Sequence, residues 1–240
     1  MGGAPEADRG ARAGRILDAA KELLLRWGYR RVTIDEIAAR AGVGKGTVYL
    51  HWRTRDQLFL AVAAREAAEM NDALADAMDE DPAEVALHRY MRRFFVEAMR
   101  RPVLRAVFTR DSDTLGNFLS APPYDTVRGA KLVASHTYLE ALIDAGLLRD
   151  GLAAADLDYP LPTIVYGFFA VEPLFGASPG LTLDAKADHL ADVLHRTFEP
   201  AHAPDPARYA AVAPRAAAVF RRLARDFRGA AYGEIPGGSA

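Results

Sequence analysis

The chain contains no cysteine among its 240 residues. This absence excludes disulfide bonds, metal sites built from thiolates and cysteine nucleophiles. No apolar run approaches the roughly 18 residues that a membrane-spanning helix needs, and the N-terminal stretch lacks the apolar segment of a secretory signal. We therefore expect a cytoplasmic protein that has no membrane partner.

Enzyme signatures are also missing from the sequence. It contains no HExxH, GxSxG or GxxxxGK(S/T) motif, and no GxGxxG motif after a strand. The histidines show no tight metal-ligand spacing along the chain. They are His51, His88, His136, His189, His195 and His202. We predict no enzyme activity, no cofactor and no metal site, while histidine pairs that form between distant segments stay open.

The composition is that of an ordinary globular protein, with 50% hydrophobic and 26% charged residues. Charge, however, is unevenly distributed along the chain. Residues 1–60 hold 11 Lys and Arg against 7 Asp and Glu, a balance of +4 in a chain whose net charge is −2. A basic N-terminal part on an acidic remainder favours nucleic-acid binding at one end of the molecule.

The most informative stretch is TIDEIAARAGVGKGTVYLHWRTRDQL, which covers residues 33–58. Thr33 followed by Glu36 is a capping box and predicts the start of a helix. Apolar residues then recur at helical spacing, so this short helix buries one face. Gly42 supplies the left-handed backbone on which helices commonly end.

A second short helix is predicted from Lys45 to about Trp52, with Gly44 at its start. Val48 and Trp52 lie four residues apart and can both face inward. Two short helices across a glycine-containing turn form a helix-turn-helix, whose second helix fits the major groove of DNA.

Further helices flank this motif on both sides. An apolar stripe from Ala11 to Trp27 predicts a bracing helix, and residues 1–10 are expected to be disordered. Thr54 caps the helix that follows, with Arg55 in its first turn. A cation there opposes the helix dipole, so Arg55 is suited to an external anion such as phosphate.

The register of these residues resembles the DNA-binding domain of the TetR (tetracycline-repressor) family over about Ala11 to Leu60. The resemblance rests on Thr33, Ile37-Ala38, Ala41-Gly42-Val43, Lys45-Gly46-Thr47-Val48-Tyr49, His51-Trp52 and Arg55-Asp56-Gln57-Leu58. It departs from the family at Gly44, where Ser is common, and at Trp52, where Phe is usual. It implies a homodimeric repressor that binds a palindromic operator in double-stranded DNA and is released by a small-molecule effector.

The resemblance also implies a set of DNA-binding residues. They are Thr33, Lys45, Gly46, Thr47, Tyr49, Leu50, His51 and Arg55. Thr33 would hold a phosphate, and Tyr49, His51 and Arg55 would contact phosphates. Base edges would be met by Lys45, Gly46, Thr47 and Leu50. For Tyr49 and His51 the alternative is packing between helices. Arg9, Arg12 and Arg15 either lie along phosphates or are solvated charges.

The rest of the chain has helical periodicity and no strand pattern, so we predict an all-α fold. Its predicted parts are a three-helix helix-turn-helix DNA-binding domain at 11–56 and a helical-bundle ligand-binding and dimerisation domain at 57–228. The second domain includes an extra C-terminal helix at about 207–228, and residues 229–240 form a disordered tail. A DNA-binding architectural or interaction protein that uses this extra helix is one alternative, and a regulator without a ligand is another.

Two body segments are candidates for the dimer interface. Residues 160–176 are apolar nearly all round and are expected to be buried on both sides, and residues 183–198 follow. In the family the last two body helices pair with those of a second chain. The implied interface residues are Ile164, Phe168, Leu174, Leu190, Val193, Leu194 and Phe198. Filling the core of one chain is the alternative.

An effector pocket is also implied by the resemblance. Its candidate residues are Met91, Phe94, Phe95, Met99, Phe108, Phe118, His136, Tyr166, Phe168 and Phe169. Their aromatic and methionine side chains favour a lipophilic or aromatic ligand, with His136 as the polar member. Core packing is the alternative for each.

Overall fold

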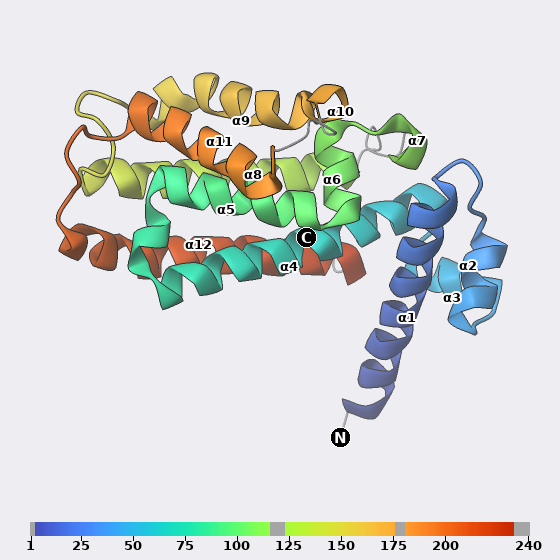
Figure 1. The fold of residues 1–240 in the computed structure, drawn as a ribbon. Helices are drawn as coiled ribbons and strands as arrows, with labels where there is room; N and C mark the ends of the chain where they lie inside the picture. The colour runs from blue at the N-terminus through green and yellow to red at the C-terminus, as the bar shows by residue number, and fades with distance from the viewer. Residues whose placement is uncertain (1–2, 116–122, 176–180, 233–240) are drawn as a thin grey trace. The chain divides into compact units, whose positions relative to one another are not determined.

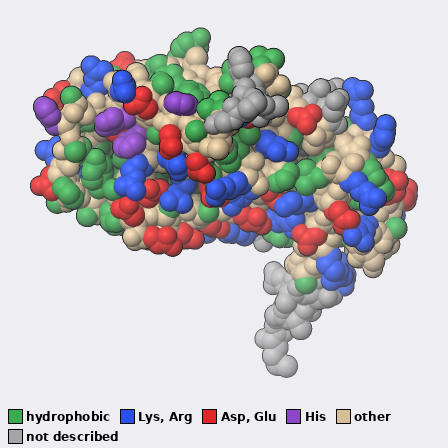
Figure 2. All heavy atoms as spheres, in the orientation of Figure 1, with side chains coloured by type: hydrophobic (Ala, Val, Ile, Leu, Met, Phe, Trp, Pro, Cys, Tyr) green, Lys and Arg blue, Asp and Glu red, His purple; other side chains and the backbone are tan. Residues whose placement is uncertain are grey.

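A computed structural model describes residues 3–115, 123–175 and 181–232 (Figure 1). Every regular element in these ranges is a helix, which confirms the predicted all-α fold. None of the described helices is long and apolar enough to cross a bilayer. Acidic and basic side chains are interspersed over the face that Figure 2 shows.

Three helices form the N-terminal part: α1 (Gly3–Trp27), α2 (Ile34–Ala41) and α3 (Lys45–His51). Helix α1 begins at Gly3, so the prediction that residues 1–10 are disordered is wrong. Proline is tolerated in the first turn of a helix, where Pro5 lies. The small polar residues there suggested disorder, whereas most of them are compatible with a helix.

Helix α4 (Arg55–Glu80) runs without a break for 26 residues. The Gln57 N–H donates to Thr54 Oγ1 at 3.1 Å, so Thr54 caps it as predicted. The remaining helices follow in chain order. They are η1 (Pro82–Val85), α5 (Leu87–Arg100), α6 (Pro102–Thr109), α7 (Ser112–Leu115), α8 (Pro123–Asp144), η3 (Ala154–Leu157), α9 (Pro160–Ala170), α10 (Glu172–Phe175), α11 (Leu183–Phe198) and α12 (Pro206–Tyr232).

The apolar segment 160–176 differs from its prediction. It divides into α9 and α10 because α9 ends at Ala170, shortly before Pro173. Only one face of α9 is buried within the chain, through Leu161, Val165 and Phe169. The other face stays exposed, so the expectation of burial on both sides is wrong for a single chain.

Helix α12 is longer than the predicted extra helix and continues to Tyr232. The tail expected from residue 229 therefore does not begin there. Its end is held because Ala231 is buried and its carbonyl accepts a hydrogen bond from Trp52 Nε1 at 3.1 Å. Residues 233–240, the rest of the predicted tail, lie outside the described residues.

The chain divides into two compact units. The first comprises Met1–Ala68, Pro102–Arg128 and Arg225–Ala240, and the second comprises Glu69–Arg101 and Gly129–Ala224. Predicted boundaries at 56 and 228 differ from these. The unit boundaries fall inside α4 and α12, which are both continuous helices. The local sequence therefore contains no helix-breaking signal at these boundaries.

Each unit has its own apolar core. In the first, helices α2, α3, α6 and α7 pack against α1. Fully buried side chains there include Ile16, Leu17, Leu24, Ile37, Val48 and Leu58. In the second, α11 packs against α5 and α9. Its fully buried side chains include Phe95, Leu142, Phe169, Leu190 and Leu194.

Candidate nucleic-acid interface

The turn between α2 and α3 has the predicted geometry. Gly42 has φ 68° and ψ 37°, the left-handed conformation, and its N–H donates to the carbonyls of Ala38 and Ala39. Gly44 precedes α3 with extended backbone at φ −75° and ψ 148°. These two glycines end one short helix and begin the next, which gives the helix-turn-helix its compact turn.

Helix α3 has one buried and one exposed face. Val48 is fully buried, and Trp52, which ends the helix, is buried and hydrogen-bonded through its ring nitrogen. On the outside, Leu50 is 79% exposed and Tyr49 is 44% exposed. The inward side chains fix the helix, so the outward side chains are displayed from a rigid element.

Thr33 forms the complete capping box at the start of α2. Its Oγ1 accepts from the Glu36 N–H at 3.3 Å, and its own N–H donates to Glu36 Oε2 at 2.8 Å. The residue is exposed. Because the positive end of a helix dipole attracts anions, this position is compatible with a phosphate contact.

Lys45 and Gly46 lie at the exposed start of α3. Lys45 Nζ pairs with Asp35 Oδ2 at 2.8 Å, and this hydrogen bond raises the pKa of the lysine. The pair is open to water, so another partner can compete for the ammonium group. A Cβ on Gly46 would meet no atom within 4 Å. The fold itself therefore does not require glycine there.

A hollow lies between the first turns of α1 and the outer side of α3. Arg9, Arg12, Thr47, Leu50 and His51 line it. Burial lowers the pKa of His51, and Arg9 and Arg12 lower it further. A neutral imidazole beside two guanidinium groups leaves this hollow positive, which suits an anionic ligand.

Arg55 is used within the domain. Its guanidinium donates to the Val32 carbonyl at 3.0 Å and lies 4.2 Å from the centre of the Tyr29 ring. The Tyr29 hydroxyl donates in turn to Asp56. Sequence reasoning missed Tyr29, because no local pattern connects it with residues 26 and 27 positions later. The predicted phosphate contact of Arg55 stays a prediction.

The predicted dimer residues separate into two groups. Leu190, Leu194 and Phe198 are buried in their own chain, where α11 packs on α5, so their assignment to a partner surface is wrong. Helical periodicity marked them as apolar but did not show which neighbour covers them. Ile164 and Phe168 are half-buried, while Leu174 and Val193 are exposed.

Four of the predicted pocket residues, Phe94, Phe95, Phe168 and Phe169, pack on one another. The Phe95 and Phe169 rings lie 4.8 Å apart between centres, with Phe94 and Phe168 beside them at 6.1 and 6.4 Å. Met91, Met99 and Phe108 are half-buried, and Tyr166 is partly exposed. Phe118 lies outside the described residues. This cluster forms core in the second unit, to which Phe108 does not belong.

His136 is not the polar member of an apolar pocket, which corrects its assignment. Its Nε2 lies 2.6 Å from Asp158 Oδ1, and both side chains are open to solvent. Leu132 and Val133, which precede His136 by about one turn of α8, are exposed. Helix α8 therefore has less of its surface covered within the chain than its composition indicates.

Comparisons with known proteins agree with this geometry. Residues 16–62 match the family model described as bacterial regulatory proteins, tetR family. Over 70 residues the chain is 37% identical to the transcriptional activator FasR of Mycolicibacterium smegmatis, covering 29% of this chain and 32% of that protein. Over 127 residues it is 32% identical to a helix-turn-helix transcriptional repressor of Mycobacterium tuberculosis, covering 52% and 66%.

The fold is also similar to a solved structure. A transcriptional regulator of Saccharomonospora viridis in complex with choline superposes with a TM-score of 0.54 at 20% identity, covering 80% of this chain and 99% of that one. The matched stretches of the two curated relatives span 32% and 66% of their lengths.

An N-terminal helix-turn-helix with an exposed second helix, joined to further helices, defines a DNA-binding transcriptional regulator. The chain belongs to the TetR family of helix-turn-helix regulators. Members of this family are regulators of transcription rather than enzymes.

Proposed function

We propose that the chain is a homodimeric repressor that binds a palindromic operator and is released by a small effector. One observation carries the DNA-binding part of this proposal. Helix α3 displays Tyr49 and Leu50 outward while Val48 and Trp52 hold it from within. Large side chains on a rigid, exposed helix beside a positive hollow are what the major groove requires.

The contacts can be assigned by chemistry. Lys45, once released from Asp35, can donate to guanine O6 and N7, and the Thr47 methyl or Leu50 can touch a thymine methyl. Gly46 permits close approach of the backbone. Thr33, Tyr49 and His51 contact phosphates, and the arginines of the hollow extend this phosphate surface.

The dimer is supported by an exposed apolar surface in the second unit, which we call the apolar face. It consists of Tyr159, Tyr166, Val171, Leu174 and Val193. Tyr159 is 80% exposed and Leu174 is 77% exposed. Exposed apolar side chains that gather on neighbouring helices, as α9, α10 and α11 are, favour protein association. A second copy of the chain is the partner that a two-fold symmetric operator requires.

Effector release is the finer part of the proposal. A protein of the same fold was solved in complex with choline. The proposed lipophilic or aromatic character of the ligand rests on the aromatic and methionine content of the sequence, because the rings around Phe95 pack on one another. Release of DNA requires that the effector bind better to the conformation that does not fit the operator.

Selection of bound sequences from random duplex DNA tests the proposal. The wild-type chain should enrich a palindrome with half-sites about 34–36 Å apart, or a multiple of this spacing. Tyr49→Ala should weaken binding to all sequences, because it removes a phosphate contact. Lys45→Ala should change base preference within each half-site by roughly 1–3 kcal/mol.

Contradiction would come from binding without an enriched palindrome that neither substitution changes. The effector part is tested separately by displacement of the recovered operator. Lipophilic and aromatic compounds should displace it, and displacement by small polar metabolites alone would contradict the proposed ligand class.

A further inference from the structure

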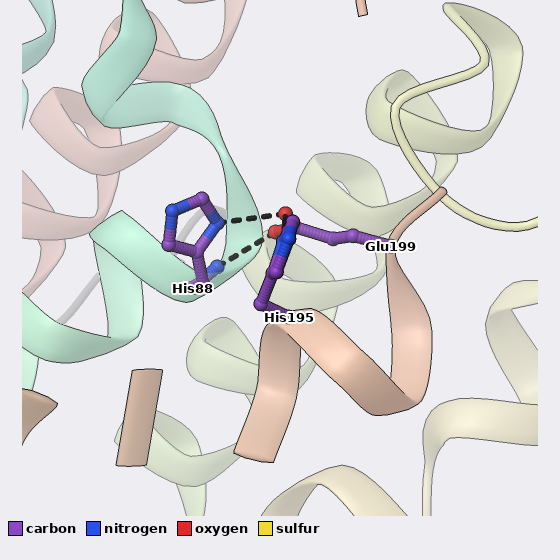
Figure 3. Close-up of side chains that lie close together, drawn as sticks. All are labelled: His88, His195 and Glu199. Carbon is purple, nitrogen blue, oxygen red and sulfur yellow. Dashed lines mark hydrogen bonds and ion pairs between the residues drawn. The ribbon is translucent and has the colours of Figure 1, made fainter. Parts of the chain in front are cut away.

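Two histidines and a glutamate from distant parts of the sequence meet in the second unit (Figure 3). His88 lies in the first turn of α5, and His195 and Glu199 lie at the end of α11. Their ligand-type atoms all lie within 4.8 Å of one another. Figure 2 shows histidine side chains gathered at one end of the visible face. We call these three residues the histidine cluster.

The carboxylate of Glu199 is fixed from several sides. One oxygen, Oε1, accepts from the His88 backbone N–H at 2.8 Å. The other, Oε2, lies 2.7 Å from His88 Nδ1 and 2.8 Å from His195 Nδ1. Both imidazole rings therefore present the same nitrogen to one oxygen atom.

Burial and charge distinguish the Glu199 carboxylate from the two imidazoles of the cluster. The Glu199 side chain is 5% exposed, whereas those of His88 and His195 are 28% and 45% exposed. Burial acts to raise the pKa of Glu199, but hydrogen bonds from His88 and His195 outweigh it and hold the pKa below its usual value. A buried anion thus lies behind two imidazoles that reach solvent.

We propose that His88, His195 and Glu199 bind a divalent transition-metal ion of the Zn²⁺ type. Two imidazoles and one carboxylate are a ligand set that Zn²⁺ uses, with water in the fourth position. Imidazole ligands favour Zn²⁺ and its neighbours over Mg²⁺ or Ca²⁺. The exposed edges of the two rings give the ion and its water a route in.

Metal binding requires the ligand atoms to move. Bonds of about 2.0–2.1 Å in a tetrahedral site place ligand atoms roughly 3.3 Å apart. The Nδ1 to Oε2 distances of 2.7 and 2.8 Å must therefore open slightly, and the wider separations, which reach up to 4.8 Å, must close. Each neutral imidazole carries its proton on Nε2 in the bound state, so that Nδ1 donates its lone pair to the metal. The His88 backbone N–H keeps the carboxylate oriented.

A purely structural role is the competing explanation. The Glu199 carboxylate caps the start of α5, and the imidazoles could serve only as its hydrogen-bond partners. The His136–Asp158 pair is an example of such a contact, because it joins two groups at the surface and no third His, Cys, Asp or Glu ligand accompanies it among the described residues. Metal titration separates the two explanations.

The test uses the full chain without a histidine tag, and Zn²⁺ as the probe in competition with a chromogenic chelator. Wild type should bind one equivalent, and Zn²⁺ should raise its melting temperature. His195→Gln and His88→Gln should each lower the affinity at least tenfold, because glutamine can hydrogen-bond to Glu199 but is a poor zinc ligand. His189→Gln is the matched control, an exposed histidine of α11 outside the cluster.

The control should keep wild-type affinity within about twofold and the same thermal response. Equal Zn²⁺ affinity in wild type, His195→Gln and His88→Gln would overturn the proposal, as would absence of a bound equivalent in wild type. Circular dichroism of each variant checks that its fold is retained. The His195→Gln variant is expected to disturb the fold less than His88→Gln, because the His195 side chain is the more exposed of the two.

Discussion

Helix α3 and the apolar face both leave large side chains exposed, but their surroundings differ. On α3, Tyr49 and Leu50 stand beside Lys45 and a hollow that contains two arginines. The apolar face, by contrast, consists of exposed apolar side chains on and beside α9, α10 and α11, with Tyr159 and Leu174 the most exposed. Exposure alone therefore does not identify a partner. Cationic surroundings suit a polyanion, while apolar surroundings suit another protein surface.

The largest expected effect is a loss of stability on removal of Trp52, the buried side chain that holds the end of α3. Trp52→Ala deletes a buried ring and leaves the Ala231 carbonyl without its hydrogen bond. We expect a loss of about 3–5 kcal/mol in the free energy of unfolding, measured by urea denaturation. Trp27→Ala is the control, since Trp27 is partly exposed, and it should cost about 1 kcal/mol or less. Equal losses for both would contradict the packing described for α3.

The next effect concerns the apolar face. Leu174→Asp combined with Val193→Asp places charges on its exposed side chains. We expect a monomer by analytical ultracentrifugation. Operator affinity should fall about 100-fold, because a monomer binds one half-site and no longer holds a second DNA-binding domain close to the other half-site. Arg215→Asp, an exposed change on α12, should remain dimeric. A double variant that stays dimeric would show that a different surface pairs the chains.

A third change acts on the outer side of α3. Tyr49→Ala and Leu50→Ala should each lower operator affinity by about 1–3 kcal/mol while changing the free energy of unfolding by no more than about 0.5 kcal/mol. Fluorescence anisotropy and urea denaturation measure the two quantities. A stability loss that exceeds the affinity loss would mean that these side chains pack within the domain.

The smallest effect is a dependence of DNA affinity on pH. The pKa of His51 lies below its usual value in the free protein, because of burial and of the charges of Arg9 and Arg12. A phosphate contact would raise this pKa in the complex, so the complex holds more protons. Affinity should then rise a few-fold as the pH falls from about 7 to 6. His51→Gln should remove that rise, and an unchanged profile in this variant would argue against the contact.

The helix-turn-helix was predictable because its signals are local. The capping box of Thr33 and Glu36, the left-handed Gly42 and the inward Val48 and Trp52 depend on neighbours within a few residues. The hydrogen bond from Trp52 to Ala231 was not predictable, since 179 positions separate the two residues. The start of α1 was missed because the small polar residues and glycines near the N-terminus signalled disorder, whereas the helix begins at Gly3.

The second unit was harder because its features depend on contacts between distant segments. Apolar periodicity located α11 with its observed bounds but did not show that Leu190 and Leu194 face α5 rather than another chain. The histidine cluster joins residues 107 and 111 positions apart, so no spacing along the sequence reveals it. Its third ligand, Glu199, begins the proline-rich stretch EPAHAPDPA at residues 199–207, where no sequence motif indicates a ligand.

Comparison of the recovered palindrome with a duplex that has one half-site scrambled is the most direct test. The account predicts two chains on the intact palindrome and at least 100-fold weaker binding to the scrambled duplex. That result requires both the α3 contacts and a paired chain. Equal affinity for the two duplexes would contradict the claim that this protein recognises an operator as a dimer.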